Sequence, residues 1–249
     1  MHVSDPSAFA FAELASECLR TCDLLACEID LDISSSYDVD SLLRMEENSI
    51  SAMISDKKYN KMRKQFIRTF GLDIAMFDNY VPIFLVNLIT ESIMMREGRE
   101  ALDLFIWKKA IEYDIERTGL ENFDAHYEIL NKIPPEDQLK LLVKLSRNTK
   151  AFRKSLHTLK NLYAAGNYKM LYKMTRKSLG KLRKIMLDER NEIMVSRIEK
   201  LSEDKRLFAA MGASHLSGKN GIIAGLKRKA FTVKQMQQAS SSISETEEE

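Results

Sequence analysis

Proline, glycine and cysteine are all scarce in this sequence. The chain has 249 residues, of which 4 are Pro, 9 are Gly and 3 are Cys. Few turn-forming residues, together with abundant Leu, Met, Lys and Glu, favour a helical protein. The cysteines, Cys18, Cys22 and Cys27, are odd in number and match no zinc-binding spacing. We therefore expect reduced thiols partly buried in a core rather than a disulfide framework.

Long hydrophobic runs are also missing. The best candidate, residues 81–95, is interrupted by Asn87 and Glu91 and is too short to span a bilayer. No signal peptide is recognisable. With 45% apolar and 30% charged residues, the composition indicates a soluble chain that can bury a real core. There is no internal repeat.

Acidic residues are absent from one long stretch. Residues 138–187 contain no Asp or Glu and fourteen Lys and Arg, whereas residues 1–56 contain twelve acidic and two basic residues. Such asymmetry is typical of contact with nucleic acid or a membrane. Because no nucleic-acid-binding motif accompanies the basic stretch, we do not expect a nucleic-acid partner. A solvated face, or a partner for the acidic N-terminal part, is the ordinary alternative.

Short apolar segments near both ends predict strands, and the middle predicts helices. We expect strands over 24–31, 207–211 and 231–236, and a short extended piece over 118–123. Helices are expected over 6–20, 38–55, 57–70, 81–96, 99–117, almost continuously over 134–201 with breaks near Gly166 and Gly180, and over 221–229. The predicted fold is a helix-rich α/β domain over 1–236. Its small central sheet is built from strands at both termini, with a helical insertion over about 38–200. The Ser- and Glu-rich tail 237–249 is expected to be disordered.

The most informative pattern is an apolar strand that ends at a glycine and is followed by a histidine. The run 207–211 ends at Gly212, and His215 follows. A glycine at a strand end permits a sharp turn or a close approach. His215 would then lie at the carboxyl edge of a sheet, where α/β proteins place their sites. Glu28 lies in the first predicted strand, where a buried unpaired carboxylate would be costly.

Two histidines and a carboxylate make a candidate metal site. This combination of ligands is common for zinc, iron, manganese or cobalt, and here it would be His2, Glu28 and His215. Arg190 and Asn191 could orient a carboxylate or stabilise an oxyanion.

Each candidate residue also has an ordinary interpretation. His2 could belong to a disordered terminus, Glu28 could be an edge-strand carboxylate facing solvent, and His215 could be a turn residue. Arg190 could form a structural ion pair or cap a helix. Asp103 and Glu121 are weaker candidates. His126 and His157 are expected to be surface residues, and Trp107 a core residue.

The same residues resemble the TraB/GumN family, which includes the Tiki proteins. The resemblance rests on Glu189-Arg190-Asn191, on Gly212-Ala-Ser-His215-Leu-Ser-Gly218-Lys-Asn-Gly221, and on Phe231-Thr-Val233. Softer matches are Glu28, Leu102-Asp103, Gly119-Leu-Glu121 and Tyr163-x-x-Gly166-Asn. The resemblance covers nearly the whole chain.

The resemblance implies a metal-dependent peptidase acting on a peptide or protein substrate. His2, Glu28 and His215 would bind a divalent metal (Mn, Co or Zn), and Glu28, Arg190, Asn191 and His215 would serve the reaction. The family's first Gly-x-x-His motif is present only as Met1-His2, which predicts that Met1 is an internal methionine preceded by a first strand. Cellular location stays open, since an upstream segment would carry any targeting signal. The alternative is a non-catalytic regulatory protein that binds a partner or polyanion through the basic helical face 138–187.

Overall fold

The computed structural model describes residues 9, 11–34, 36–94 and 100–236 of the chain. It is a helix-rich α/β structure with a three-stranded parallel sheet in the order β2-β1-β3. The strands are β1 (Leu24–Cys27), β2 (Glu116–Gly119) and β3 (Leu207–Ala209). The predicted fold class is confirmed. His2 and the tail 237–249 lie outside the described residues, and the predicted domain boundaries stay predictions.

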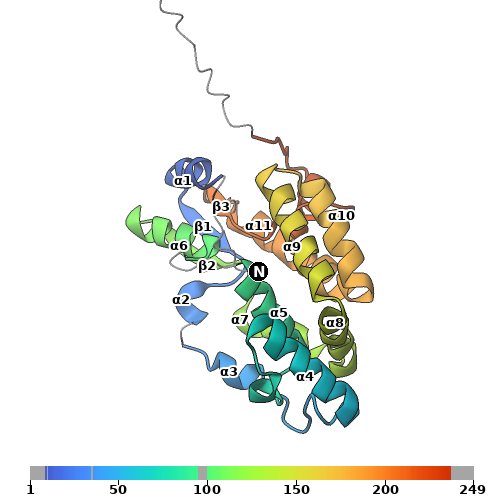
Figure 1. The fold of residues 1–249 in the computed structure, drawn as a ribbon. Helices are drawn as coiled ribbons and strands as arrows, with labels where there is room; N and C mark the ends of the chain where they lie inside the picture. Colours follow the sequence, from blue (N-terminus) through green and yellow to red (C-terminus); the bar gives the residue numbers. More distant parts are fainter. Residues whose placement is uncertain (1–8, 10, 35, 95–99, 237–249) are drawn as a thin grey trace, which may run out of the picture.

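The helices follow in chain order (Figure 1). Those before β3 are α1 (Ala12–Arg20), α2 (Leu31–Ser34), α3 (Val39–Leu42), α4 (Asp56–Phe70), η2 (Ile74–Phe77), α5 (Pro82–Met94), α6 (Leu102–Glu112), α7 (Phe123–Asn131), α8 (Pro135–Arg147), α9 (Thr149–Ala164), α10 (Tyr168–Leu179), η3 (Gly180–Leu182), the π-helix η4 (Lys184–Glu189) and α11 (Arg190–Leu201). After β3 come η5 (Ala213–His215) and α12 (Ile222–Arg228).

Strand β1 lies at the centre of the sheet and is buried on both faces. Leu25 and Cys27 pack with Trp107, on the face covered by α1 and α6. Ala26 packs with Met194, on the face covered by α11 and α12. A strand buried on both faces reads as an unbroken apolar run, as in parallel sheets generally. The expected core position of Trp107 is confirmed.

A second core holds the helical part together, below and to the right of the sheet in Figure 1. Phe66 of α4, Leu85 and Ile89 of α5, and Leu142 of α8 are at its centre, all essentially fully buried. The helix breaks expected near Gly166 and Gly180 are confirmed, since both glycines have positive φ. Asn167 caps α10 by accepting a hydrogen bond from the Met170 N–H at 3.2 Å.

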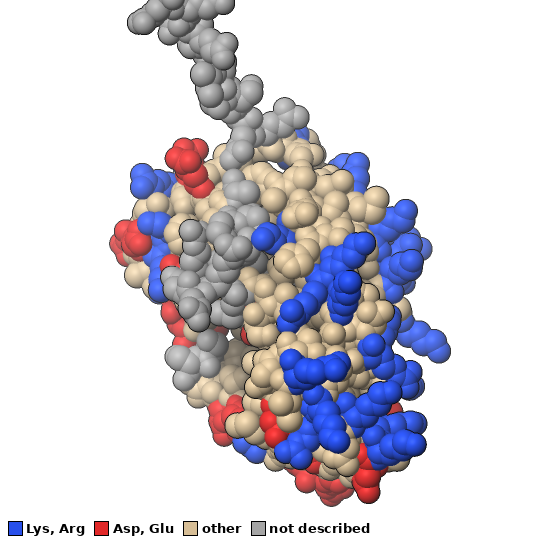
Figure 2. Space-filling view, in the orientation of Figure 1, with Lys and Arg blue, Asp and Glu red and all other residues tan. Residues whose placement is uncertain are grey.

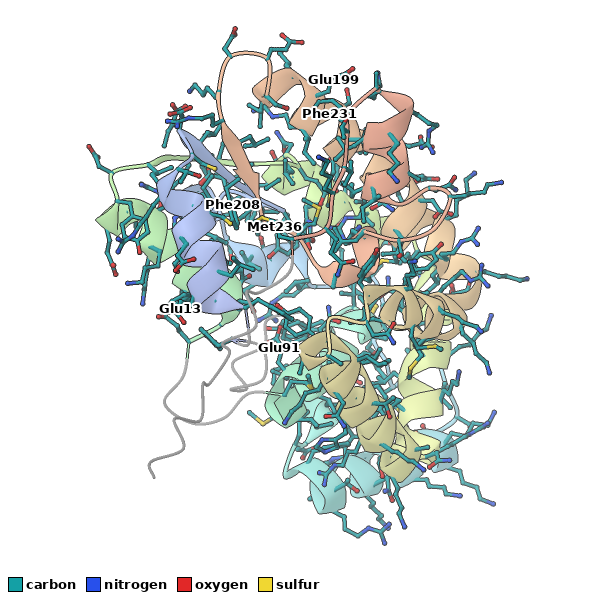
Figure 3. The ribbon with its side chains drawn as sticks, turned by 90° about the horizontal axis from the view of Figure 1, so that it is seen from above. Glu13, Glu91, Glu199, Phe208, Phe231 and Met236 are labelled. Carbon is teal, nitrogen blue, oxygen red and sulfur yellow. The ribbon has the colours of Figure 1, made fainter. Side chains whose placement is uncertain are left out.

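Two predicted elements are wrong. Residues 231–236 form no strand; they leave α12 and run toward α1, where the Cys18 Sγ lies 3.9 Å from the Met236 Sδ. Figure 3 labels both ends of this segment, Phe231 and Met236. Residues 38–55 are helical only in α3; the rest are turns and irregular segments, with an isolated bridge between Arg44 and Tyr80.

The third strand comes from within the predicted helical insertion. The extended piece expected over 118–123 overlaps β2, which pairs with β1 but begins two residues earlier and ends at Gly119. The helix predicted over 99–117 is therefore too long: α6 ends at Glu112, and Glu116 and Arg117 belong to β2. Among the described residues, no helix combines the length and the apolar character needed to cross a bilayer.

Candidate active site at the carboxyl edge of the sheet

The three parallel strands bring their following residues to one edge. Glu28 directly follows β1, and Glu121 and Gly212 come shortly after β2 and β3. Main-chain bonds extend the pairing past the strands: the Glu121 N–H donates to the Glu28 carbonyl at 2.9 Å. Because parallel strands end together, residues far apart in sequence meet at this edge.

Arg190, the first residue of α11, joins two carboxylates at this edge. Its Nη2 lies 2.6 Å from Oε2 of Glu28 and 2.5 Å from Oε2 of Glu121. Its Nε lies 3.0 Å from each carboxylate oxygen of Glu121. The Arg190 and Glu121 side chains are only 8% and 2% exposed. The ion pair considered from the sequence is therefore present, as a buried bridge between two strand ends.

This bridge keeps all three groups charged. Burial opposes ionisation of Glu121, but hydrogen bonds from His126 and Arg190 together lower the pKa of its carboxyl group. Burial likewise opposes the charge on Arg190, yet the two carboxylates raise the pKa of its guanidinium. Removing one partner from such a cluster leaves a buried charge without compensation.

Glu28 also contacts the loop that carries His215. Its Oε1 accepts a hydrogen bond from the Gly212 N–H at 2.7 Å. Burial would raise the pKa of the Glu28 carboxyl group, but His215, Arg190 and the Gly212 N–H outweigh it and lower that pKa to about 2. Glu28 is therefore ionised at neutral pH. It directly follows β1, the central strand, and its side chain is paired with Arg190, so the interpretation as an edge-strand carboxylate facing solvent is wrong.

Asn191 fixes the orientation and tautomer of His215. The Asn191 Nδ2 donates to the Asn220 carbonyl at 2.8 Å, so its Oδ1 is the atom that faces the imidazole. That oxygen lies 2.6 Å from Nδ1 of His215 and can only accept. The His215 Nδ1 therefore carries the proton, and its Nε2 has a free lone pair.

His215 is also kept neutral. Burial lowers the pKa of its imidazole, and the charge of Arg190 lowers it further; Glu28 and Glu121 act in the opposite direction, and the pKa falls to about 4. The imidazole also lies close to Gly212: a Cβ built there would lie 3.7 Å from His215 Cδ2 and 3.2 Å from Glu28 Oε1. A neutral imidazole and an ionised carboxylate thus lie on either side of one glycine.

A π-helix directly precedes Arg190 and Asn191. Residues 184–189 form η4, which continues without a break into α11. The wider turn of a π-helix rotates the residues that follow it, and such turns are frequent at functional sites. Arg190 and Asn191 are consecutive and both buried, the first toward the carboxylates and the second toward His215.

Glycines allow the backbone to pass closely around the site. A Cβ on Gly221 would lie 2.3 Å from the Ser217 carbonyl oxygen, so the loop after His215 could not close with a larger residue. Gly218 has φ +96°, and a Cβ there would lie 2.4 Å from the Tyr172 ring of α10. The glycines of the C-terminal motif therefore have steric reasons for their positions.

His126 was wrongly expected to be an ordinary surface residue. Its Nδ1 lies 3.2 Å from Oε2 of Glu121 and 3.3 Å from Nη2 of Arg190. Glu121, only a weak candidate in the sequence, is among the most buried carboxylates here. Its position just after β2, matching that of Glu28 after β1, is the signal that could have found it. The other expected surface histidine, His157, is exposed.

The structure brings together Glu28, Arg190, Asn191 and His215. Asp103 lies on α6, which covers the opposite face of the sheet from α11. His2 lies outside the described residues.

An open hollow of about 820 Å³ adjoins the site along the end of β2 and α11; it is lined by residues that include Thr118, Glu121, Glu192, Ile193, Arg197 and Lys200.

The described residues do not by themselves form a complete metal site. No group of three or more His, Cys, Asp and Glu side chains among them could hold an ion. Glu28 and His215 offer two suitable donors, an ionised carboxylate and a neutral imidazole whose other nitrogen is held by an amide. That last feature is usual for a histidine that binds a metal. A third donor would have to come from elsewhere, and His2 is the residue that the sequence suggests.

Comparison with known proteins identifies the family but gives no individual relative. Neither the curated proteins nor the solved structures yielded a match. The model of the TraB/PrgY/gumN family matches residues 1–235, which include the whole sheet and all the site residues above. The chain therefore belongs to the TraB/PrgY/gumN family.

Proposed function

We propose that this protein is a metal-dependent hydrolase of peptides whose site is the carboxyl edge of the sheet. The observation that supports this most is the state of His215. Its imidazole is buried, neutral and held through Nδ1 by Asn191, so Nε2 is available as a ligand. A histidine with a pKa of about 4 is a weak base at neutral pH, which favours a ligand over a general base.

Glu28 would be the second ligand. Arg190 and the Gly212 N–H each occupy one side of its carboxylate, which fixes the group and keeps it ionised. Each carboxylate oxygen retains a further lone pair for a cation. His2 is the third ligand in this proposal. A divalent metal bound there would supply a Lewis acid and a bound water of lowered pKa.

The protein's own residues would position the substrate. Arg190 and Asn191 orient Glu28 and His215 by direct hydrogen bonds. The hollow along β2 and α11 leaves room beside the site for an extended peptide segment. A peptide is the substrate class that the family resemblance suggests.

The test is metal binding and peptide hydrolysis by four forms of the full chain. Mn²⁺, Co²⁺ and Zn²⁺ are titrated against the wild type, His215→Ala, Glu28→Gln and, as a control, His157→Ala, which changes an exposed histidine of α9. We expect one ion per wild-type and control chain and a loss of affinity of at least about tenfold in the site variants. A library of labelled peptides is then screened for cleavage with the metal that binds.

Metal binding that is indifferent to His215 and Glu28 would refute the proposed ligand set. Binding without cleavage of any peptide would leave a metal site but not a peptidase. In that case the alternative of a non-catalytic regulatory protein would be favoured.

A further inference from the structure

We propose that one broad face of the molecule docks on an anionic lipid bilayer. Figure 2 shows Lys and Arg gathered on the right-hand side, where Figure 1 places α4, α8, α9 and α10. We call the exposed Lys and Arg of these four helices the basic face; they are Lys57, Lys58, Lys61, Lys64 and Arg68 of α4, Lys140, Lys144 and Arg147 of α8, Lys150, Arg153 and Lys154 of α9, and Lys169, Lys173, Arg176 and Lys177 of α10. The face extends the basic stretch 138–187 by one further helix.

The charge on this face is largely uncompensated. Acidic residues occur on these four helices only in the first turns of α4 and α8, at Asp56, Glu136 and Asp137. Within the described part of the chain, none of the exposed basic residues of α9 or α10 forms a salt bridge. The face therefore carries a positive field that few acidic side chains on these helices neutralise, and an anionic partner would be attracted to it.

The type of charge favours lipid over nucleic acid. Eleven of the fifteen exposed basic residues on the face are lysines. Lysine acts as a compact point charge, whereas the arginine fork is the preferred group for bidentate recognition of nucleic acid. The hollow described above lies along β2 and α11, away from these helices, and is no groove for a strand on this face.

Exposed apolar side chains lie on the same helices. Met170 of α10 is 42% exposed and Ile67 of α4 is 45% exposed. Apolar side chains among lysines are typical of helices that lie in the interface of a bilayer, since they enter the headgroup region while the lysines contact lipid charges. A nucleic-acid backbone would offer no apolar partner to Met170 and Ile67.

The proposal is tested by sedimentation of the full chain with vesicles. One set is phosphatidylcholine alone and the other contains about 30 mol % phosphatidylserine. We expect binding only to the second set, and release when the salt is raised from about 0.05 to 0.5 M. The triple variant Lys169→Gln, Lys173→Gln and Lys177→Gln should bind about a hundredfold more weakly. The control variant Lys200→Gln, Lys227→Gln and Lys234→Gln removes three exposed lysines from elsewhere and should bind within about threefold of wild type.

Several results would overturn the proposal. One is equal binding to both vesicle sets; another is an equal loss in the control variant. A third is tighter binding of wild type to a random-sequence DNA duplex than to the anionic vesicles, which would assign the face to nucleic acid. If the triple variant does not fold, judged by its thermal unfolding, the wild-type lipid and salt comparisons still decide. The proposal does not depend on hydrolase activity.

Discussion

Arg190 is the residue on which the candidate site most depends. It connects the ends of β1 and β2 through Glu28 and Glu121, and it begins the helix that also carries Asn191. A buried charge pair adds little net stability relative to an apolar core, because both charges lose hydration. Its role here is to hold two carboxylates at fixed positions beside His215.

We predict that Arg190→Met destabilises the protein by about 3–5 kcal/mol, because Glu121 would be left buried and uncompensated. Urea unfolding followed by circular dichroism measures this difference. Lys200→Met, on an exposed position of the same helix, should change stability by less than about 0.5 kcal/mol. In the double variant that combines Arg190→Met with Glu121→Met, most of the lost free energy of unfolding should be recovered. A double variant that is as unstable as the single one would contradict this account.

His215 should make stability depend on pH in a defined window. The pKa of its imidazole is about 4 in the folded protein, against an ordinary value of 6.5. Between these values the unfolded chain binds a proton that the folded protein does not, so stability falls as the pH falls from about 6.5 to about 4, by about 3 kcal/mol in total. Urea unfolding of wild type, His215→Gln and His157→Gln across this range tests the assignment. Below about pH 5 carboxylates such as Glu28 add a dependence of their own, so the comparison uses the range from about 6.5 to 5. There the fall in stability should disappear in the first variant and persist in the second; its persistence in both would refute the assignment.

The site was partly predictable from single residues. The Gly212 and His215 pattern predicted a histidine at the carboxyl edge, and Glu28, Arg190 and Asn191 are found with it. The contribution of His126 was not predictable. Its contact with Glu121 depends on how α7 leaves β2, a tertiary arrangement that no local pattern records.

At the scale of elements, helix α12 is held against α11 by a close contact that only glycine permits. A Cβ on Gly225 would lie 2.5 Å from Cγ2 of Val195. This contact stabilises the helix pair that covers one face of the sheet. Both helices begin near the Asn191 amide, which donates to the Asn220 carbonyl just before α12.

We predict that Gly225→Ala destabilises the protein by about 1–3 kcal/mol by forcing α12 away from α11. Thermal unfolding measures the effect. Adding Val195→Ala opens space for the new methyl group, so the double variant should be more stable than the sum of the two single changes predicts. Strict additivity would show that the two side chains do not compete for the same space.

Elements with a strong helical pattern were predictable, and two weaker ones were not. The segment 231–236 has strand-forming residues, but Ala230 adopts a positive φ of 64° and turns the chain away from the sheet. Strand propensity depends on a partner, and the sequence does not say whether one is present. In 38–55, side-chain caps such as Asp38 accepting from the Ser41 N–H compete with helix.

At the scale of the whole molecule, the sequence predicted the fold class because the strand patterns near the two ends and the helical pattern between them were strong. The buried apolar strand near the N-terminus and the glycine-ended strand near the C-terminus indicated a small sheet built from both ends of the chain, and the helical periodicity between them was clear. The order of the strands and the third strand, β2, depended on long-range pairing. Composition also indicated the basic face, but only the structure shows that α4 joins it.

The position of β1 has a consequence for how the protein is made. β1 is the central strand, yet one of its partners is β3, and the ion pair at their start joins residues 183 positions apart, Asp23 and Arg206. During synthesis from the N-terminus, this fully apolar strand has an unpaired edge until most of the chain has been made. Long-range pairing of this kind slows folding and exposes strands to aggregation. The helical core of α4, α5 and α8 lies entirely within residues 56–147, so it can form before β3 has been synthesised.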